Sequence, residues 1–146
     1  MNRLDQLLSH YAESHQHPTN EAIHCVAVPV IMLTLLGLLY ELHPIVFALF
    51  LVASFVYYAR LSTRVLVLMI VWSGLLTGLI VLMGDLRLEI CIVLFVLSWT
   101  AQFIGHKIEG RKPSFFEDIQ YLWVGPLFVA DVLGRRYGLP CRLRRL

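Results

Sequence analysis

The chain has 146 residues, of which 58% are hydrophobic and 15% are charged. A soluble domain carries roughly 45–50% apolar and about 25% charged residues, so this composition excludes an ordinary water-soluble fold. The formal net charge is only +2, and nothing in the sequence indicates a nucleic-acid partner. Cys25, Cys91 and Cys141 have no CxxC spacing and predict neither a disulfide framework nor a zinc site. We therefore expect a multi-pass membrane protein, in which lipid solvates the excess apolar surface.

The N-terminal segment precedes the first apolar run. Residues 1–21 contain acidic residues and histidines but no apolar stretch, which argues against a cleaved signal peptide. Leu4, Leu7, Leu8 and Tyr11 recur at helical spacing. This spacing predicts a short amphipathic helix on the membrane surface, ahead of the first span.

Four apolar runs predict transmembrane helices. They lie at about 23–40, 44–59, 65–84 and 90–106. A helix rises ~1.5 Å per residue and needs about 20 residues to cross a ~30 Å hydrocarbon core. The second and fourth runs are short, so they must include flanking residues or lie in a thinned bilayer.

A further region, at about 119–133, is too short to cross a membrane comfortably. Its Gly125-Pro126 pair predicts a break in helical continuity. We expect an interfacial or re-entrant helix here, packed on the bundle. The predicted fold is an all-α integral membrane protein with a single membrane domain over residues 1–146.

The basic residues predict the orientation in the membrane. If the N-terminus is cytoplasmic, eleven of the twelve lysines and arginines fall on that side and only Arg87 falls on the other. The eleven are Arg3, Arg60, Arg64, Lys107, Arg111, Lys112, Arg135, Arg136, Arg142, Arg144 and Arg145. We expect both termini in the cytoplasm, in a bacterial inner membrane or an endoplasmic reticulum, with the arginine-rich tail on anionic lipid.

In this topology five of the six histidines lie at the cytoplasmic face, and His43 lies alone on the other. The five are His10, His15, His17, His24 and His106. Ionisable groups at a bilayer edge are costly unless they have a partner or a role, so the cluster predicts a metal site. For His10, His17 and His43 an ordinary interfacial or hydrogen-bonded side chain is the favoured interpretation.

The spacing of His15 and His24 requires a turn between them. On one continuous helix the two side chains would face opposite ways. Pro18 disfavours a helical conformation for the residue before it, so the helix cannot be continuous between the two histidines. Asn20, followed by an acidic residue, is the predicted N-cap of the first span. The chain could therefore fold His15 back towards His24.

The fourth span carries a stripe of polar residues that reaches His106. Trp99, Gln102, His106 and Glu109 recur at helical spacing in an otherwise apolar run. Gln102 could orient a ligating histidine through a hydrogen bond. Two interpretations of Glu109 stay open: a metal ligand, or a solvated ion pair with the basic residues that follow it.

Three motifs in the sequence are typical of one enzyme family. They read Y-x3-H-x2-P-x-N-x3-H-x4-P at 11–29, W-x2-QFIGH-x2-E-x3-P at 99–113, and GPLF at 125–128. Together they resemble the 2-hydroxy fatty acid dioxygenase family over about residues 11–131. The two histidine motifs are specific together, although each is weak alone.

The resemblance implies an iron(II)-dependent α-oxidation in which a 2-hydroxy fatty acid and oxygen give a fatty acid one carbon shorter and carbon dioxide. By position it implies His15, His24 and His106 as metal ligands, with Glu109 as an open fourth candidate. Non-haem iron(II) suits imidazole or mixed imidazole and carboxylate ligands. We expect five residues to surround the metal or the substrate, and Arg111 or Lys112 to hold the substrate carboxylate. The five are Tyr11, Asn20, Gln102, Arg111 and Lys112.

The sequence departs from the family's pattern at four positions. His17 stands where asparagine is frequent, Ala27 for glycine, Ser114 for alanine and Asp131 for glutamate. None of these changes removes a histidine. His17 adds one further candidate ligand, and Asp131 weakens any role given to that acid.

Two other classes of function stay open from the residues. A four-helix haem protein would use His24 and His106 as axial ligands. A small membrane scaffold or lipid-binding protein would leave the histidines as interfacial side chains. Two-iron fatty-acid hydroxylases and desaturases use clustered HxxxH and HxxHH boxes, which this sequence lacks. Iron content and a haem absorption band would distinguish these classes.

Overall fold

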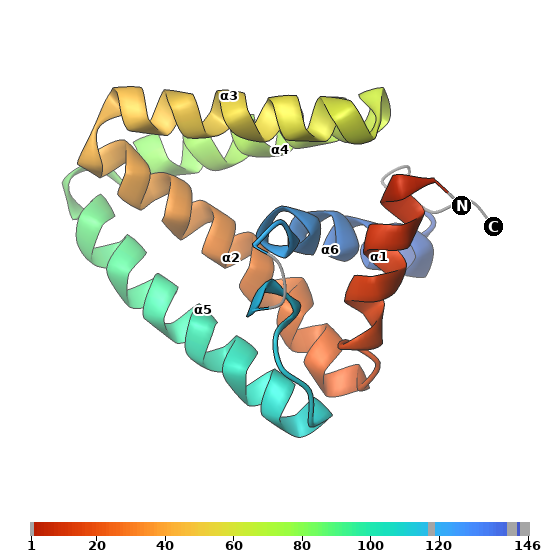
Figure 1. Ribbon diagram of the computed structural model, residues 1–146. Helices are drawn as coiled ribbons and strands as arrows, with labels where there is room; N and C mark the ends of the chain where they lie inside the picture. Colours follow the sequence, from red (N-terminus) through yellow and green to blue (C-terminus); the bar gives the residue numbers. More distant parts are fainter. Residues whose placement is uncertain (1, 117–118, 140–142, 144–146) are drawn as a thin grey trace. The chain divides into compact units, whose positions relative to one another are not determined.

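The computed structural model describes residues 2–116, 119–139 and 143, and all regular structure in this part of the chain is helical (Figure 1). In chain order the elements are α1 (Arg3–Glu13), α2 (Pro18–Leu42), α3 (Pro44–Leu61), α4 (Thr63–Leu82), η1 (Gly84–Leu86), α5 (Arg87–Glu109), η2 (Ser114–Phe116) and α6 (Tyr121–Tyr137). The chain divides into two compact units. The terminal unit comprises Met1–Pro29 and Trp99–Leu146, and the middle unit comprises Val30–Ser98.

Four helical segments are long and apolar enough to cross a membrane, which confirms the number of predicted spans. They are Pro18–Leu42, Pro44–Leu61, Thr63–Leu82 and Gly84–Glu109. The second and fourth segments extend beyond their apolar runs into flanking residues, as the shortness of those runs predicts. Orientation across the membrane stays a prediction.

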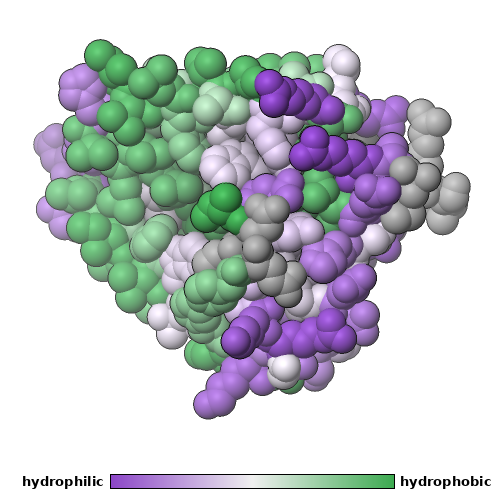
Figure 2. Space-filling model, viewed as in Figure 1, coloured by the Kyte–Doolittle hydropathy of each residue, from purple (hydrophilic) through white to green (hydrophobic). Residues whose placement is uncertain are grey.

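The middle unit contains α3 and α4, which run side by side (Figure 1). Leu36, Leu76 and Ile80 form its buried apolar cluster. Large apolar side chains such as Leu49 and Leu75 point outwards, and Figure 2 shows hydrophobic residues over α3 and much of α5. A soluble protein rarely exposes so much apolar surface, so these faces suit contact with lipid.

Arg87, the one basic residue predicted on the far side of the membrane, is not left unpaired. Its guanidinium forms an ion pair with Glu41, and its Nε donates to the Ile80 carbonyl oxygen at 2.7 Å. The same group lies 4.9 Å from the centre of the Tyr40 ring. These contacts connect the end of α2 with the last turn of α4 and the start of α5.

In the terminal unit, α1 forms as the sequence predicts. Asn2 caps the helix by accepting from the Asp5 N–H at 2.9 Å. The four buried side chains are the predicted apolar set, Leu4, Leu7, Leu8 and Tyr11. α1 packs against α6, so α6 contributes to covering this face. A location of α1 on the membrane surface stays a prediction.

The expected break at Gly125-Pro126 is wrong, because α6 is continuous through both residues. Pro126 lies in the second turn, where it removes a single backbone donor, and both residues are buried. A Cβ at Gly125 would lie 3.2 Å from the Tyr11 hydroxyl, so glycine lets α1 approach α6 closely. The helix covers 121–137 instead of 119–133 and ends at Gly138, whose φ of +65° suits glycine. Whether α6 is interfacial or re-entrant stays a prediction.

Several predicted features fall at the C-terminal end of the chain. Cys141, Arg142, Arg144 and Arg145 lie outside the described residues. The predicted lipid contact of the arginine-rich tail falls largely on these residues. Cys25 and Cys91 carry free thiols.

Candidate metal centre

The loop between α1 and α2 brings His15 back to His24, as the sequence predicts. α1 ends at Glu13 and α2 begins at Pro18. The two imidazole rings then lie with centroids 4.2 Å apart. The turn therefore gives two histidines nine positions apart in sequence a common environment.

The start of α2 differs from the prediction. Asn20 is not the N-cap, because Pro18 is already helical, and proline is favoured at the first helical position, where its missing donor is not needed. His17 instead acts at the helix start: its Nδ1 accepts from the Thr19 N–H at 3.2 Å. Because Asn20 does not cap the helix, its side chain turns inwards, where it is fully buried.

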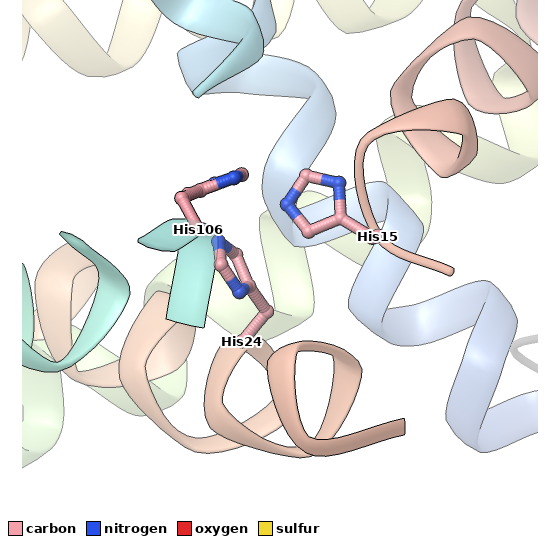
Figure 3. A group of neighbouring side chains, drawn as sticks. All are labelled: His15, His24 and His106. Carbon is pink, nitrogen blue, oxygen red and sulfur yellow. The ribbon is translucent and has the colours of Figure 1, made fainter. Parts of the chain in front are cut away.

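His15, His24 and His106 form one buried group (Figure 3). One potential ligand atom from each side chain lies within 4.8 Å of the other two. The side chains come from the α1–α2 loop, from the second turn of α2 and from the last turn of α5. Their exposed fractions are 2%, 0% and 4%. Figure 3 shows the three rings pointing towards one another.

Each of these histidines has one buried nitrogen without a hydrogen-bond partner among the described residues. These atoms are His15 Nε2, His24 Nε2 and His106 Nδ1. A buried polar atom left unpaired costs about 1–3 kcal/mol. Three such atoms facing one space are the arrangement that a bound metal ion would satisfy, and imidazole ligands suit iron as well as zinc, copper and nickel.

Hydrogen bonds to the backbone set the tautomers of two of the rings. His15 Nδ1 lies 2.7 Å from the Tyr11 carbonyl oxygen, and His24 Nδ1 lies 2.9 Å from the Asn20 carbonyl oxygen. A carbonyl only accepts, so each Nδ1 carries the proton and each Nε2 keeps its lone pair. Such outer contacts orient imidazole ligands and raise their basicity.

His15 is also fixed by its surroundings. Its ring stacks on Tyr11 with centroids 4.3 Å apart and an angle of 5° between planes. Burial, together with the neighbouring His24, lowers the pKa of His15 to about 3. The ring is therefore neutral at physiological pH, as metal coordination requires. Burial raises the pKa of Tyr11, so its phenol stays protonated.

Glu109 contacts the α1–α2 loop, and the three-histidine group does not include it. Its carboxylate accepts from the Gln16 N–H at 3.1 Å and the His17 N–H at 2.7 Å. Asn20 Nδ2 lies 3.4 Å from the same carboxylate and donates to the Ser14 carbonyl oxygen at 3.0 Å. The geometry thus gives Glu109 a structural task, while its role as a ligand stays a prediction.

Three further predicted residues lie on α5 or just beyond its end. Gln102 is buried one turn before His106 on α5. Arg111 and Lys112 are exposed, immediately beyond the end of α5. Their predicted tasks, orienting a ligand and holding a carboxylate, stay predictions.

Three further histidines lie outside the group. His10 is on α1, 3.6 Å from Glu13, and His17 caps α2 as described. His43 caps α3 in the middle unit, where its Nδ1 accepts from the Ile45 N–H at 3.1 Å. All three thus have local contacts of their own.

Sequence reasoning missed three residues beside the group. Ser14 and Ser114 share a hydrogen bond 2.7 Å long next to His15. Gly105 precedes His106, and a Cβ there would collide with Asn20 Oδ1. The departure from the family's pattern at Ser114 was the one available signal. Asp131, another departure, is buried and accepts from the Leu143 N–H at 3.0 Å.

Glu109→Gln provides a test of the two interpretations of this residue. A glutamine keeps one acceptor but turns an N–H₂ towards the second backbone donor. Because both bonds are exposed, we expect a loss of about 0.5–1.5 kcal/mol in unfolding free energy. Bound metal should stay stoichiometric. Glu13→Gln, on the exposed face of α1, is the matched control. Loss of metal from a folded Glu109→Gln protein would instead identify a carboxylate ligand.

The geometry of the group can now be set beside known proteins. The family model described as 2-hydroxy-palmitic acid dioxygenase Mpo1-like matches residues 1–137. Neither the curated proteins nor the solved structures contain a match to the chain. The family match confirms the resemblance that the histidine motifs predicted, and the chain belongs to the Mpo1-like family.

Proposed function

We propose that this protein is an iron(II)-dependent dioxygenase that α-oxidises 2-hydroxy fatty acids. The observation that carries the proposal is the group formed by His15, His24 and His106, whose unpaired ring nitrogens face one another in a buried site. The family's name adds the substrate class and the reaction class. Oxygen is the second substrate, and membrane lipid surrounds the spans.

The overall reaction balances without another reductant. A 2-hydroxy acid, R–CH(OH)–COOH, and O₂ give R–COOH, CO₂ and H₂O. The bond between C1 and C2 breaks, C2 is oxidised to a carboxyl group, C1 leaves as CO₂, and the four electrons that reduce oxygen come from the substrate. No 2-oxoglutarate is needed.

The three histidines would hold the metal. When bound, iron(II) would supply redox chemistry with oxygen and coordination positions for the hydroxyl and carboxylate of the substrate. The protein would supply a buried set of imidazole ligands, of which His15 is held by Tyr11 and kept neutral by its lowered pKa. Burial also limits the access of bulk water to the reacting carbons.

The position of the group along the spans suits an amphipathic substrate. His24 lies near the start of α2 and His106 near the end of α5. Both helices continue from these points into long apolar stretches. The fatty chain would stay in the apolar region of the membrane while its polar end reaches the histidines, and Arg111 or Lys112 would draw the carboxylate in. We place this end of the spans at the cytoplasmic face.

The haem alternative has less support. Axial histidines bind on opposite faces of a flat macrocycle. Here His24 and His106 have ring centroids 4.8 Å apart, and a third ring, that of His15, lies 4.2 and 4.8 Å from them. Three converging rings favour a single small ion.

Turnover with the metal as the one added cofactor tests the proposal. We expect iron-loaded protein with a 2-hydroxy fatty acid and oxygen to release the acid one carbon shorter, with CO₂ derived from C1. A substrate labelled at C1, followed by mass spectrometry, measures both products. The unhydroxylated fatty acid is the control and should not react. A requirement for 2-oxoglutarate, or protein that binds no iron, would contradict the proposal.

A further inference from the structure

A chain of hydroxyl groups reaches His15 from the segment that follows α5. Ser114 Oγ lies 2.7 Å from Ser14 Oγ, and Ser14 Oγ lies 3.1 Å from His15 Nδ1. The two serines are 8% and 4% exposed, for Ser14 and Ser114 respectively. They lie 100 positions apart in the sequence, so this contact joins two distant parts of the terminal unit at the histidine group.

The contacts of this chain fix the proton of His15, and either serine can donate in the bond between Ser14 and Ser114. His15 Nδ1 donates to the Tyr11 carbonyl oxygen, so it cannot accept from Ser14. The Ser14 hydroxyl can donate its single proton to the same carbonyl oxygen at 3.2 Å or to Ser114 Oγ at 2.7 Å. In the first case Ser114 donates to Ser14 Oγ, and in both cases Ser14 Oγ keeps a lone pair as a second acceptor for the His15 N–H.

Ser114 and Glu109 together hold both sides of His15. Glu109 accepts from the backbone of Gln16 and His17, directly after His15. Ser114 binds the side chain of Ser14, directly before it. The end of α5 and the start of η2 thus fix the loop on either side of the residue that must aim its Nε2 into the group.

We infer that Ser114 is a positioning residue for His15, and that it acts through Ser14. A serine hydroxyl on a loop has three rotamers, and the hydrogen bond with Ser114 selects the one in which Ser14 Oγ contacts both Tyr11 O and His15 Nδ1. Hydrogen bonds in a chain also strengthen one another in a buried site. This inference rests on the proposed function, since it concerns His15 as a metal ligand.

The test measures metal binding by purified protein in detergent, with Fe²⁺ under anaerobic conditions and Co²⁺ as a spectroscopic probe. Ser114→Ala should weaken binding about 10-fold, because the loss of an outer partner of a histidine ligand costs roughly 10- to 100-fold. Ser14→Ala should weaken it at least as much. The visible spectrum of bound Co²⁺ should change in both variants.

The double variant separates action through Ser14 from an independent effect. Once Ser14 is alanine, removing the Ser114 hydroxyl should change the dissociation constant no further, so the two effects do not add. Ser54→Ala is the matched control: this buried serine of α3 donates to the Phe50 carbonyl oxygen at 2.7 Å, in the middle unit. It should bind metal as the wild type does.

Each result has a defined meaning. Wild-type affinity and spectrum in a folded Ser114→Ala protein would overturn the inference and leave the proposed function standing. Additive effects in the double variant would also overturn it, because Ser114 would then not act through Ser14. A wild-type protein that binds no metal would overturn the proposed function and this inference together.

Discussion

Replacing His15, His24 or His106 by alanine is expected to remove bound iron and, with it, turnover. Each variant loses one of three converging ligands and leaves the other two buried nitrogens unpaired. The loss in affinity should exceed the roughly 10- to 100-fold that follows the removal of an outer hydrogen-bond partner. Iron per chain, measured by elemental analysis after gel filtration, gives the result independently of activity.

Histidines outside the group provide the controls. His43→Asn keeps an acceptor at the N-cap of α3, since asparagine is a preferred cap, and should retain iron and activity. His10→Ala removes an exposed side chain on α1; from the sequence we expect its effect to be intermediate. Full iron content in a folded His24→Ala protein, or its loss in His43→Asn, would contradict the assignment of the ligands.

The parts of the fold that the sequence predicts are those determined by composition or by one residue with a strong effect on the backbone, such as proline. Four spans follow from uncharged apolar runs, because lipid imposes the same requirement along a whole helix. Pro18 predicts the turn that returns His15 to His24, because proline prevents the helix from continuing through it. The prediction that His15, His24 and His106 form one group also needs the family resemblance, because the position of a histidine in the sequence does not show which residues lie near it in space.

The features that the sequence could not predict depend on contacts between distant segments. The continuity of α6 through Gly125-Pro126 is one: the lost hydrogen bond is a local cost, whereas the packing that outweighs it involves Tyr11. The role of Glu109 is a second such feature. In the sequence it stands near two basic residues, which suggests a surface ion pair, whereas in the structure it accepts from backbone N–H groups of the α1–α2 loop. Ser114 is a third, since its partner is 100 residues away.

Helices α2 and α5 approach each other closely inside the terminal unit, and we expect a substitution at this contact to have the second large effect on stability and iron binding. Gly105 faces Asn20, whose Oδ1 would collide with any added Cβ. Asn20 cannot swing aside easily, because its Nδ2 donates to the Ser14 carbonyl oxygen and contacts Glu109. An added methyl group must therefore displace the backbone of α5, one residue before His106.

We expect Gly105→Ala to destabilise the protein by about 1–3 kcal/mol, the usual cost of overpacking, and to weaken iron binding at least 10-fold. Gly78→Ala on α4 is the matched control, because a Cβ there meets nothing within 4 Å. Alanine is the better helix former by roughly 1 kcal/mol, so the control should be neutral or stabilised. Thermal unfolding in detergent and metal titration measure the two effects.

Removing the side chain that Gly105 faces tests the cause of this effect. Asn20→Ala alone should destabilise the protein, because it leaves the Ser14 carbonyl oxygen without that donor. It also makes room for the new methyl group, so the double variant should cost less than the sum of the two single variants. Strict additivity, or wild-type iron affinity in Gly105→Ala, would mean that contact between Asn20 and Gly105 does not set the position of His106.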